Sequence, residues 1–173
     1  GRDRRQRQMC IRDRFNRTKR NIRNYSRIKI FIVAFCWAAI TVLFPLTNQL
    51  DIDYINSILL FLQRFIFVIA YTLPFEIRDL KYDSIKLKTM PQIFGLRKTK
   101  NIAFFLLALF FILTFTIRPI SNTYLIADLL IALFTAYLIA RTKENQTKYF
   151  ASFWIESIPI LWLIIIAFLK QTI

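Results

Sequence analysis

The stretch INSILLFLQRFIFVIAYTLPF at residues 55–75 decides the fold class of this chain. It is long, apolar and interrupted by a single charged side chain, that of Arg64. A helix needs about 20 predominantly apolar residues to cross the hydrocarbon core of a bilayer. The stretch shows no alternation of apolar and polar residues, and an open sheet edge finds no hydrogen-bond partner in lipid. Residues 55–75 therefore predict a transmembrane helix.

Four further apolar runs have the same character, at residues 28–46, 102–117, 120–140 and 149–169. Hydrophobic residues make up 56% of the 173-residue chain, 18 residues are Phe, and 2 are Gly. A soluble domain of this size cannot bury so much apolar surface. We therefore expect an all-α, polytopic membrane helical bundle with five transmembrane helices in this chain.

The segments that connect the spans are alternately rich and poor in basic residues. Residues 15–29, 76–101 and 141–148 carry sixteen Lys and Arg, whereas the opposite connections carry Arg118 and Lys170. The positive-inside rule then places the 76–101 loop on the cytoplasmic side. Membrane lipid is an expected partner of the chain. Abundant Ile, Phe, Lys, Asn and Tyr indicate an AT-rich bacterial genome, so we expect the bacterial inner membrane. Because topology explains the net charge of +15, nucleic acid is not an expected partner.

The first fourteen residues stand apart from this pattern. The run RRQRQMCIRD at residues 4–13 back-translates into a transposase-type sequencing adapter, although a natural basic arm is the alternative reading. We expect residues 1–14 to lie outside the fold, as adapter-derived or disordered sequence. Residues 15–173 would then be the C-terminal part of a longer transmembrane domain whose N-terminal half is missing.

The acidic loop EIRDLKYDSIKLKTMPQIFG, residues 76–95, is the candidate site. The chain has no His, so imidazole cannot supply a base or a metal ligand. Glu76, Asp79 and Asp83 are spaced to share one face of a helix that leaves the membrane. Mg²⁺ suits such a cluster, because it binds one or two carboxylates and bridges to phosphates. Alternatively, these carboxylates pair with neighbouring cations or lipid headgroups, as in many cytoplasmic loops.

This loop resembles the second Asp-rich motif of the UbiA-type polyprenyl transferases. Asp79 and Asp83 match its D-x-x-x-D pattern, and Lys88-Thr89 and Phe94-Gly95 match later positions. Family members have nine spans, with Asp-rich motifs after the second and the sixth. The five spans here would correspond to spans five to nine. The chain departs from the family in lacking the first Asp-rich motif, and the spacer before Gly95 is short and has no Gly of its own.

The resemblance implies an integral-membrane enzyme that transfers a polyprenyl group from polyprenyl diphosphate to an unidentified acceptor. Its cofactor would be Mg²⁺, held by Asp79 and Asp83 with Glu76, and Lys86 and Lys88 would contact the diphosphate. We expect the chain alone to be inactive, because half of the metal site is missing. The alternative is a non-enzymatic polytopic membrane protein, such as a scaffold or a transporter subunit.

Three charged residues lie well inside the apolar runs, away from their ends: Arg64, Asp128 and Glu156. Charges at such depth are costly and face a bundle interior or a cavity. Arg64 either lines a cavity for the diphosphate or acceptor, or pairs with Asp128 or Glu156 to fix the packing. We expect the Phe and Trp residues to face lipid or to form interfacial belts.

Overall fold

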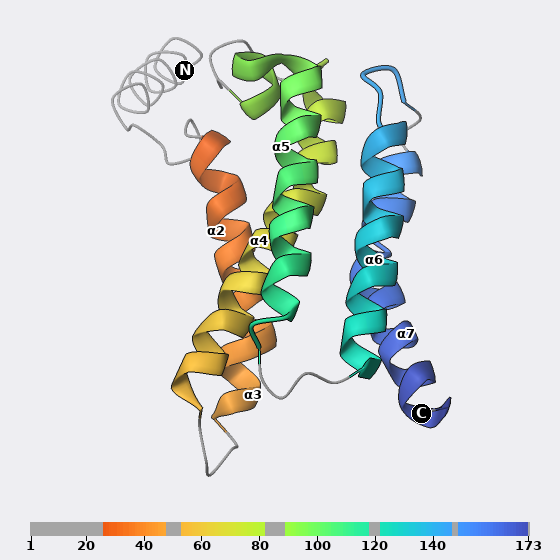
Figure 1. Ribbon diagram of the computed structural model, residues 1–173. Helices are drawn as coiled ribbons and strands as arrows, with labels where there is room; N and C mark the ends of the chain where they lie inside the picture. The colour runs from red at the N-terminus through yellow and green to blue at the C-terminus, as the bar shows by residue number, and fades with distance from the viewer. Residues whose placement is uncertain (1–25, 48–52, 82–88, 118–121, 147–148, 173) are drawn as a thin grey trace, which may run out of the picture.

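The structure, a computed structural model, is a bundle of long helices (Figure 1). It describes residues 26–47, 53–81, 89–117, 122–146 and 149–172. All secondary structure in these ranges is helical. The elements are α2 (Ser26–Ala38), η2 (Ala39–Leu43), α3 (Phe44–Leu46), α4 (Tyr54–Asp79), α5 (Met90–Thr114), α6 (Asn122–Arg141), η4 (Phe150–Ile155) and α7 (Ile158–Thr172).

Two of these elements, η2 and η4, are π-helical segments that precede a proline. Pro45 follows η2, and Pro159 follows η4. A proline ring cannot donate a backbone hydrogen bond and leaves the carbonyl four residues earlier without its partner. In η2 the helix widens, and the N–H of Phe44 bonds to the carbonyl of Ala39, five residues back. The helical path from α2 to α3 continues through this irregularity.

Helix α4 is the central element of the bundle. The side chain of Asp53 caps its first turn, accepting hydrogen bonds from the N–H groups of Ile55 (3.1 Å) and Asn56 (3.2 Å). Its 26 residues extend about 39 Å, enough to cross a hydrocarbon core of about 30 Å. It packs against α2 on one side and α5 on the other, while α6 packs against α5 and α7.

Helix α5 bends sharply near its beginning. Gly95 has φ 78° and ψ 163°, a conformation that is essentially restricted to glycine. The short segment Met90–Phe94 therefore turns away from the axis of the long segment that follows (Figure 1). The hydroxyl of Thr99 donates to the Gly95 carbonyl (2.9 Å) and closes the first turn after the bend.

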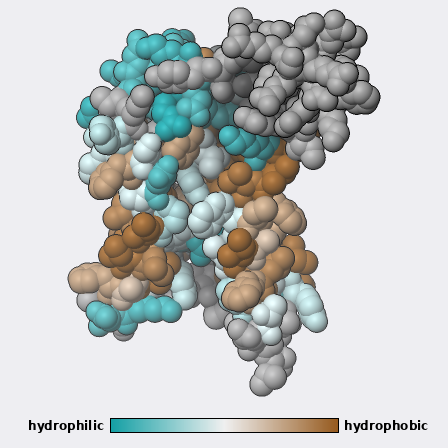
Figure 2. All heavy atoms as spheres, turned by 180° about the vertical axis from the view of Figure 1, so that it is seen from behind, coloured by the Kyte–Doolittle hydropathy of each residue, from teal (hydrophilic) through white to brown (hydrophobic). Residues whose placement is uncertain are grey.

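An aromatic cluster forms the centre of the core. Phe67 of α4 and Phe110 of α5 are almost completely buried, with ring centroids 4.6 Å apart. The ring of Trp162 from α7 lies 4.9 Å from Phe67. The outward faces of the helices are apolar as well; Phe44, Phe105 and Leu163 are each about 70% exposed. Figure 2 shows hydrophilic residues gathered mainly toward one end, a smaller hydrophilic group at the other end, and apolar patches among intermediate residues between them. Such exposed apolar area is typical of a lipid-facing surface.

Three stretches of the described helices are long and apolar enough to cross a membrane: Ile28–Leu46, Tyr54–Asp79 and Asn122–Arg141. The all-α prediction is thus confirmed for the described residues, and three helices have the length and composition of membrane spans, but the predicted five spans are not confirmed. In α5, Arg97, Lys98 and Lys100 shorten the uncharged part to residues 101–114. In the last predicted span, residues 149–169, the π-helical segment η4 and a turn come before α7. The regular apolar helix that remains, Ile158–Gln171, is shorter than a membrane-spanning helix needs to be.

Candidate functional site

One end of the bundle gathers the segments predicted to share a side of the membrane. The beginning of α2, the end of α4, the beginning of α5 and the end of α6 all lie at this end (Figure 1). Lys100 of α5 donates a hydrogen bond from its Nζ atom to the carbonyl of Ala140 in α6 (2.9 Å). Partial burial, together with repulsion from Lys143, lowers the pKa of Lys100. This end is therefore cationic, and the acidic residues of α4 lie within it.

Glu76, a predicted metal ligand, connects α4 to the beginning of α5. Its Oε2 atom accepts a hydrogen bond from the backbone N–H of Met90 (3.1 Å). The side chain of Gln92 accepts the N–H of Thr89 (3.1 Å) one residue earlier. The first N–H groups of a helix have no partner within the helix, and a nearby negative charge interacts favourably with them. Glu76 thereby fixes the position at which the chain returns after the loop.

Asp79, the second predicted metal ligand, forms an ion pair with its neighbour. The Nε atom of Arg78 lies 2.7 Å from Oδ1 of Asp79, and Nη1 of Arg78 donates to the hydroxyl of Ser152 (3.3 Å). The Asp79 side chain is 39% exposed, and its Oδ2 atom has no hydrogen-bond partner in the described part of the chain. Among the described residues, nothing occupies the second carboxylate oxygen of Asp79.

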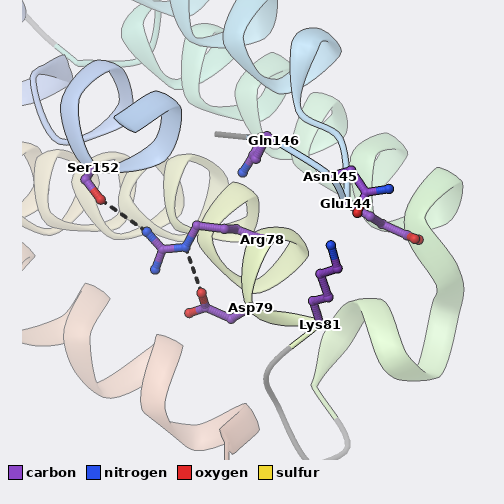
Figure 3. Close-up of a pocket in the computed structure, with 7 residues that line it drawn as sticks. All are labelled: Arg78, Asp79, Lys81, Glu144, Asn145, Gln146 and Ser152. Carbon is purple, nitrogen blue, oxygen red and sulfur yellow. Dashed lines mark hydrogen bonds and ion pairs between the residues drawn. The ribbon is translucent and has the colours of Figure 1, made fainter. Parts of the chain in front are cut away.

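A pocket of about 440 Å³ opens beside this ion pair. It lies between the end of α4 and the connection from α6 to η4 (Figure 3). Its walls are polar and carry charges of both signs: they comprise Arg78, Asp79, Lys81, Glu144, Asn145, Gln146 and Ser152. The loop residues Glu144, Asn145 and Gln146 were not predicted, because nothing in the sequence places 144–146 beside α4.

The rest of the predicted loop site lies outside the described residues. Asp83, Lys86 and Lys88 belong to the 82–88 segment, so their roles stay predictions. Among the residues that the structure does describe, no group of three or more carboxylate or thiolate side chains comes together to hold a metal. Glu76 and Asp79 are the members of the predicted metal set whose surroundings can be assigned.

Arg64, predicted to contact diphosphate, lies in a different part of the molecule. It precedes Asp79 by fifteen positions in α4, which corresponds to about 22 Å along the helix axis. This separation is far longer than a diphosphate group, so one diphosphate cannot contact both side chains. The guanidinium of Arg64 stacks on the ring of Trp162, with its carbon 3.5 Å from the ring centroid.

A buried polar network surrounds Asp128 beside this stack. Its Oδ2 atom accepts hydrogen bonds from the Thr114 hydroxyl (3.0 Å) and the Gln63 amide (3.2 Å). Its Oδ1 atom accepts the indole N–H of Trp162 (3.1 Å). The donors come from α5, α4 and α7, so the carboxylate in α6 connects four helices. Such connections are typical of polar residues within membrane bundles.

The network refines one prediction and corrects another. Arg64 forms no direct ion pair with Asp128 or Glu156 in the described part of the chain, but its charge attracts that of Asp128, and both side chains contact Trp162. Trp162 was predicted to face lipid or an interface, but it is 6% exposed, whereas Trp37 and Trp154 are each 48% exposed. Trp162 is buried because its indole N–H donates a hydrogen bond to the buried carboxylate of Asp128, while the rest of its ring packs in the apolar core.

Comparisons with protein-family models, with curated proteins and with solved structures each returned no match for this chain.

Proposed function

We propose that this chain is part of an integral-membrane prenyltransferase, which moves a polyprenyl group from its diphosphate to an acceptor with the help of Mg²⁺. The observation that carries the proposal is the position of Asp79. It lies at the end of a long apolar helix, with its side chain 39% exposed, one oxygen unpartnered among the described residues, and a polar pocket beside it. An isoprenoid tail would remain in lipid while the diphosphate reaches this end of the bundle.

The proposal includes five membrane spans, with α5 and the η4–α7 segment as the additional two. The Arg97, Lys98 and Lys100 side chains are long enough to extend from α5 toward a headgroup layer while its apolar part stays in lipid. The segment from Tyr149 to Thr172 keeps helical backbone bonds across its interruption, including Leu161 N–H to the Ser157 carbonyl (2.9 Å). The site would face the cytoplasm of a bacterium, because basic segments cluster at its end.

The described residues fit Mg²⁺ in one respect. Mg²⁺ requires one or two carboxylates and keeps several waters, and Asp79 offers an exposed carboxylate oxygen. Asp79 would hold the ion together with Asp83, while Glu76 orients the start of α5. Bound there, Mg²⁺ would neutralise charge on a leaving diphosphate. Arg78 and Lys81 add positive charge at the same pocket.

The test is release of inorganic diphosphate from a polyprenyl diphosphate by the protein in nanodiscs, with Mg²⁺ or with EDTA. The resemblance expects a second carboxylate cluster outside this chain, so the intact gene product is assayed beside the chain alone. We expect turnover with Mg²⁺, and its loss in Asp79→Asn and Asp83→Ala. Asp53→Asn is the matched control, because Asn also caps a helix and residue 53 begins α4 at the opposite end. Unchanged turnover in both site variants would sink the assignment.

A non-enzymatic membrane protein is the second candidate, and a specific observation favours it. Arg78 already neutralises Asp79, and Glu76 is engaged with the beginning of α5. Under this reading the acidic residues serve the structure, and the basic end holds anionic lipid. Replacing Arg78 by Gln separates the two candidates. A structural ion pair predicts a less stable protein with no effect of Mg²⁺, whereas a metal site predicts that Mg²⁺ restores the lost stability.

A further inference from the structure

The connection from α6 to η4 brings a buried side-chain amide to the wall of the pocket. The Oε1 atom of Gln146 accepts the backbone N–H of Lys143 (3.3 Å). Its Nε2 atom is buried and has no hydrogen-bond partner among the residues that the structure describes. A buried N–H without an acceptor is unfavourable, and such groups usually meet water or a ligand. Gln146 is one of the residues that line the pocket beside Arg78. An acceptor that enters this pocket would satisfy the amide once the Gln146 side chain turns to expose that atom.

The surroundings of this amide select an anion. Figure 3 shows the amino group of Lys81 and the amide of Gln146 directed toward the same space beside Arg78. Arg78 uses Nε for Asp79 and Nη1 for Ser152, so its guanidinium is held beside the pocket. Glu144 extends away from Arg78 in this view. Two cations and one neutral donor line this side of the pocket, which the carboxylates of Asp79 and Glu144 also line. Oxygen atoms that carry negative charge are the group that these three donors would bind most strongly.

We propose that this pocket binds a phosphoryl oxyanion through the side-chain N–H groups of Gln146, Lys81 and Arg78. The inference rests on the proposed function for its preferred ligand, the diphosphate of the prenyl donor. It adds a binding residue from the α6–η4 connection, distant in sequence from the acidic loop. A phospholipid headgroup presents the same phosphoryl chemistry and is the other source.

Binding of inorganic diphosphate tests the inference without any turnover. The full chain in dodecyl maltoside micelles, whose headgroups contain no phosphate, is titrated with diphosphate in a calorimeter. Gln146→Leu removes the donor at similar volume, and Gln146→Glu replaces it with a repelling acceptor of similar length. Because hydrogen bonds to charged groups contribute about 1.5–3 kcal/mol, we expect binding roughly 10- to 100-fold weaker in Gln146→Leu. Gln146→Glu should weaken it further.

Gln171→Leu is the matched control, because Gln171 is exposed near the end of α7, at the opposite end of the bundle. We expect it to bind diphosphate like the unaltered chain. Melting temperatures within about 2 °C of the unaltered chain show that the Gln146 variants remain folded. Equal affinity in the Gln146→Leu, Gln171→Leu and unaltered proteins overturns the inference, as does an unaltered chain that binds no diphosphate.

Phosphatidylglycerol added to the micelles distinguishes the two sources. Competition with diphosphate supports a headgroup as the occupant, and absence of competition supports the prenyl donor. Failure of the proposed function is recognised separately. Gln146-dependent binding without any prenyl transfer would remove the enzyme assignment and keep the phosphoryl site. Transfer with an unchanged KM in Gln146→Leu would keep the enzyme and remove this residue from the site.

Discussion

Replacing Asp128 by Ala is expected to destabilise the bundle strongly, because the carboxylate is 5% exposed and connects four helices. In Asp128→Ala the indole N–H of Trp162 loses its acceptor, and Gln63 retains only the Thr114 hydroxyl (2.9 Å). Thr114 can still donate to the Phe110 carbonyl (3.4 Å). The substitution also removes the negative charge of Asp128 that attracts the positive charge of Arg64.

The size of the effect follows from these contacts. Each buried donor left without an acceptor costs about 1–3 kcal/mol, and two donors are affected. Hydrogen bonds within membrane bundles average about 0.6 kcal/mol in double-mutant cycles, so three bonds give a lower bound of about 2 kcal/mol. We expect a loss of about 3 kcal/mol, which for a chain of this length lowers Tm by about 6–12 °C. Asp128→Asn should cost about 1 kcal/mol, because a flipped Gln63 amide can face the new NH₂ group.

Thermal unfolding in micelles, followed by tryptophan emission, measures this loss. Phe replacements at the half-exposed Trp37 and Trp154 leave Trp162 as the single reporter, at the centre of the network. Leu129→Ala is the control, because Leu129 follows Asp128 in α6 and is 38% exposed. We expect a shift of less than about 2 °C there. A melting temperature in Asp128→Ala equal to that of Leu129→Ala would refute the reasoning.

Three further predictions concern other parts of the bundle. Gly95→Ala should cost about 1–3 kcal/mol in unfolding free energy through backbone strain alone, because an added Cβ meets no atom within 4 Å; denaturant titration measures it. Phe67→Ala should cost about 3–5 kcal/mol, since the ring is 1% exposed, whereas Phe105→Ala, at 68% exposed, should cost much less; equal melting temperatures would contradict the assigned core. Glu76→Ala should cost about 0.5–2 kcal/mol and speed hydrogen exchange at the Met90 amide, and Glu76→Gln should preserve an acceptor there; exchange measured by mass spectrometry distinguishes them.

The positions of the long helices could be predicted from the sequence, because backbone N–H and C=O groups in lipid must form their hydrogen bonds within a helix or a closed barrel. The apolar run at residues 55–75 lies entirely within α4, and the run at 120–140 covers most of α6. The described parts of the predicted basic segments lie at one end of the bundle, as expected, whereas the side of the membrane that they face stays a prediction. The bend at Gly95 was not predicted, because a single Gly in an amphipathic stretch has several readings. The number of spans stayed open, because the bases that begin α5 shorten its apolar part.

The candidate site was predictable only where it is local in sequence. The shared location of Glu76 and Asp79 follows from helical spacing. The partners of these residues come from elsewhere: Met90 beyond the loop, and Ser152 from η4. Gln63 and Thr114 gave no sequence signal, since an isolated amide or hydroxyl in an apolar run has no preferred partner. Their roles depend on how the helices rotate about their axes, which weak amphipathicity leaves undetermined.

The central claim is that Asp79, at the inner end of α4, binds a divalent cation against diphosphate. Electron paramagnetic resonance of Mn²⁺, used in place of Mg²⁺, measures this directly, because the six-line signal of the free ion disappears on binding. With the chain in micelles and no added diphosphate, which would itself chelate Mn²⁺, we predict binding that Asp79→Asn weakens at least tenfold relative to Asp53→Asn. Equal Mn²⁺ affinity in Asp79→Asn and Asp53→Asn would contradict the claim and leave Asp79 as a partner of Arg78 alone.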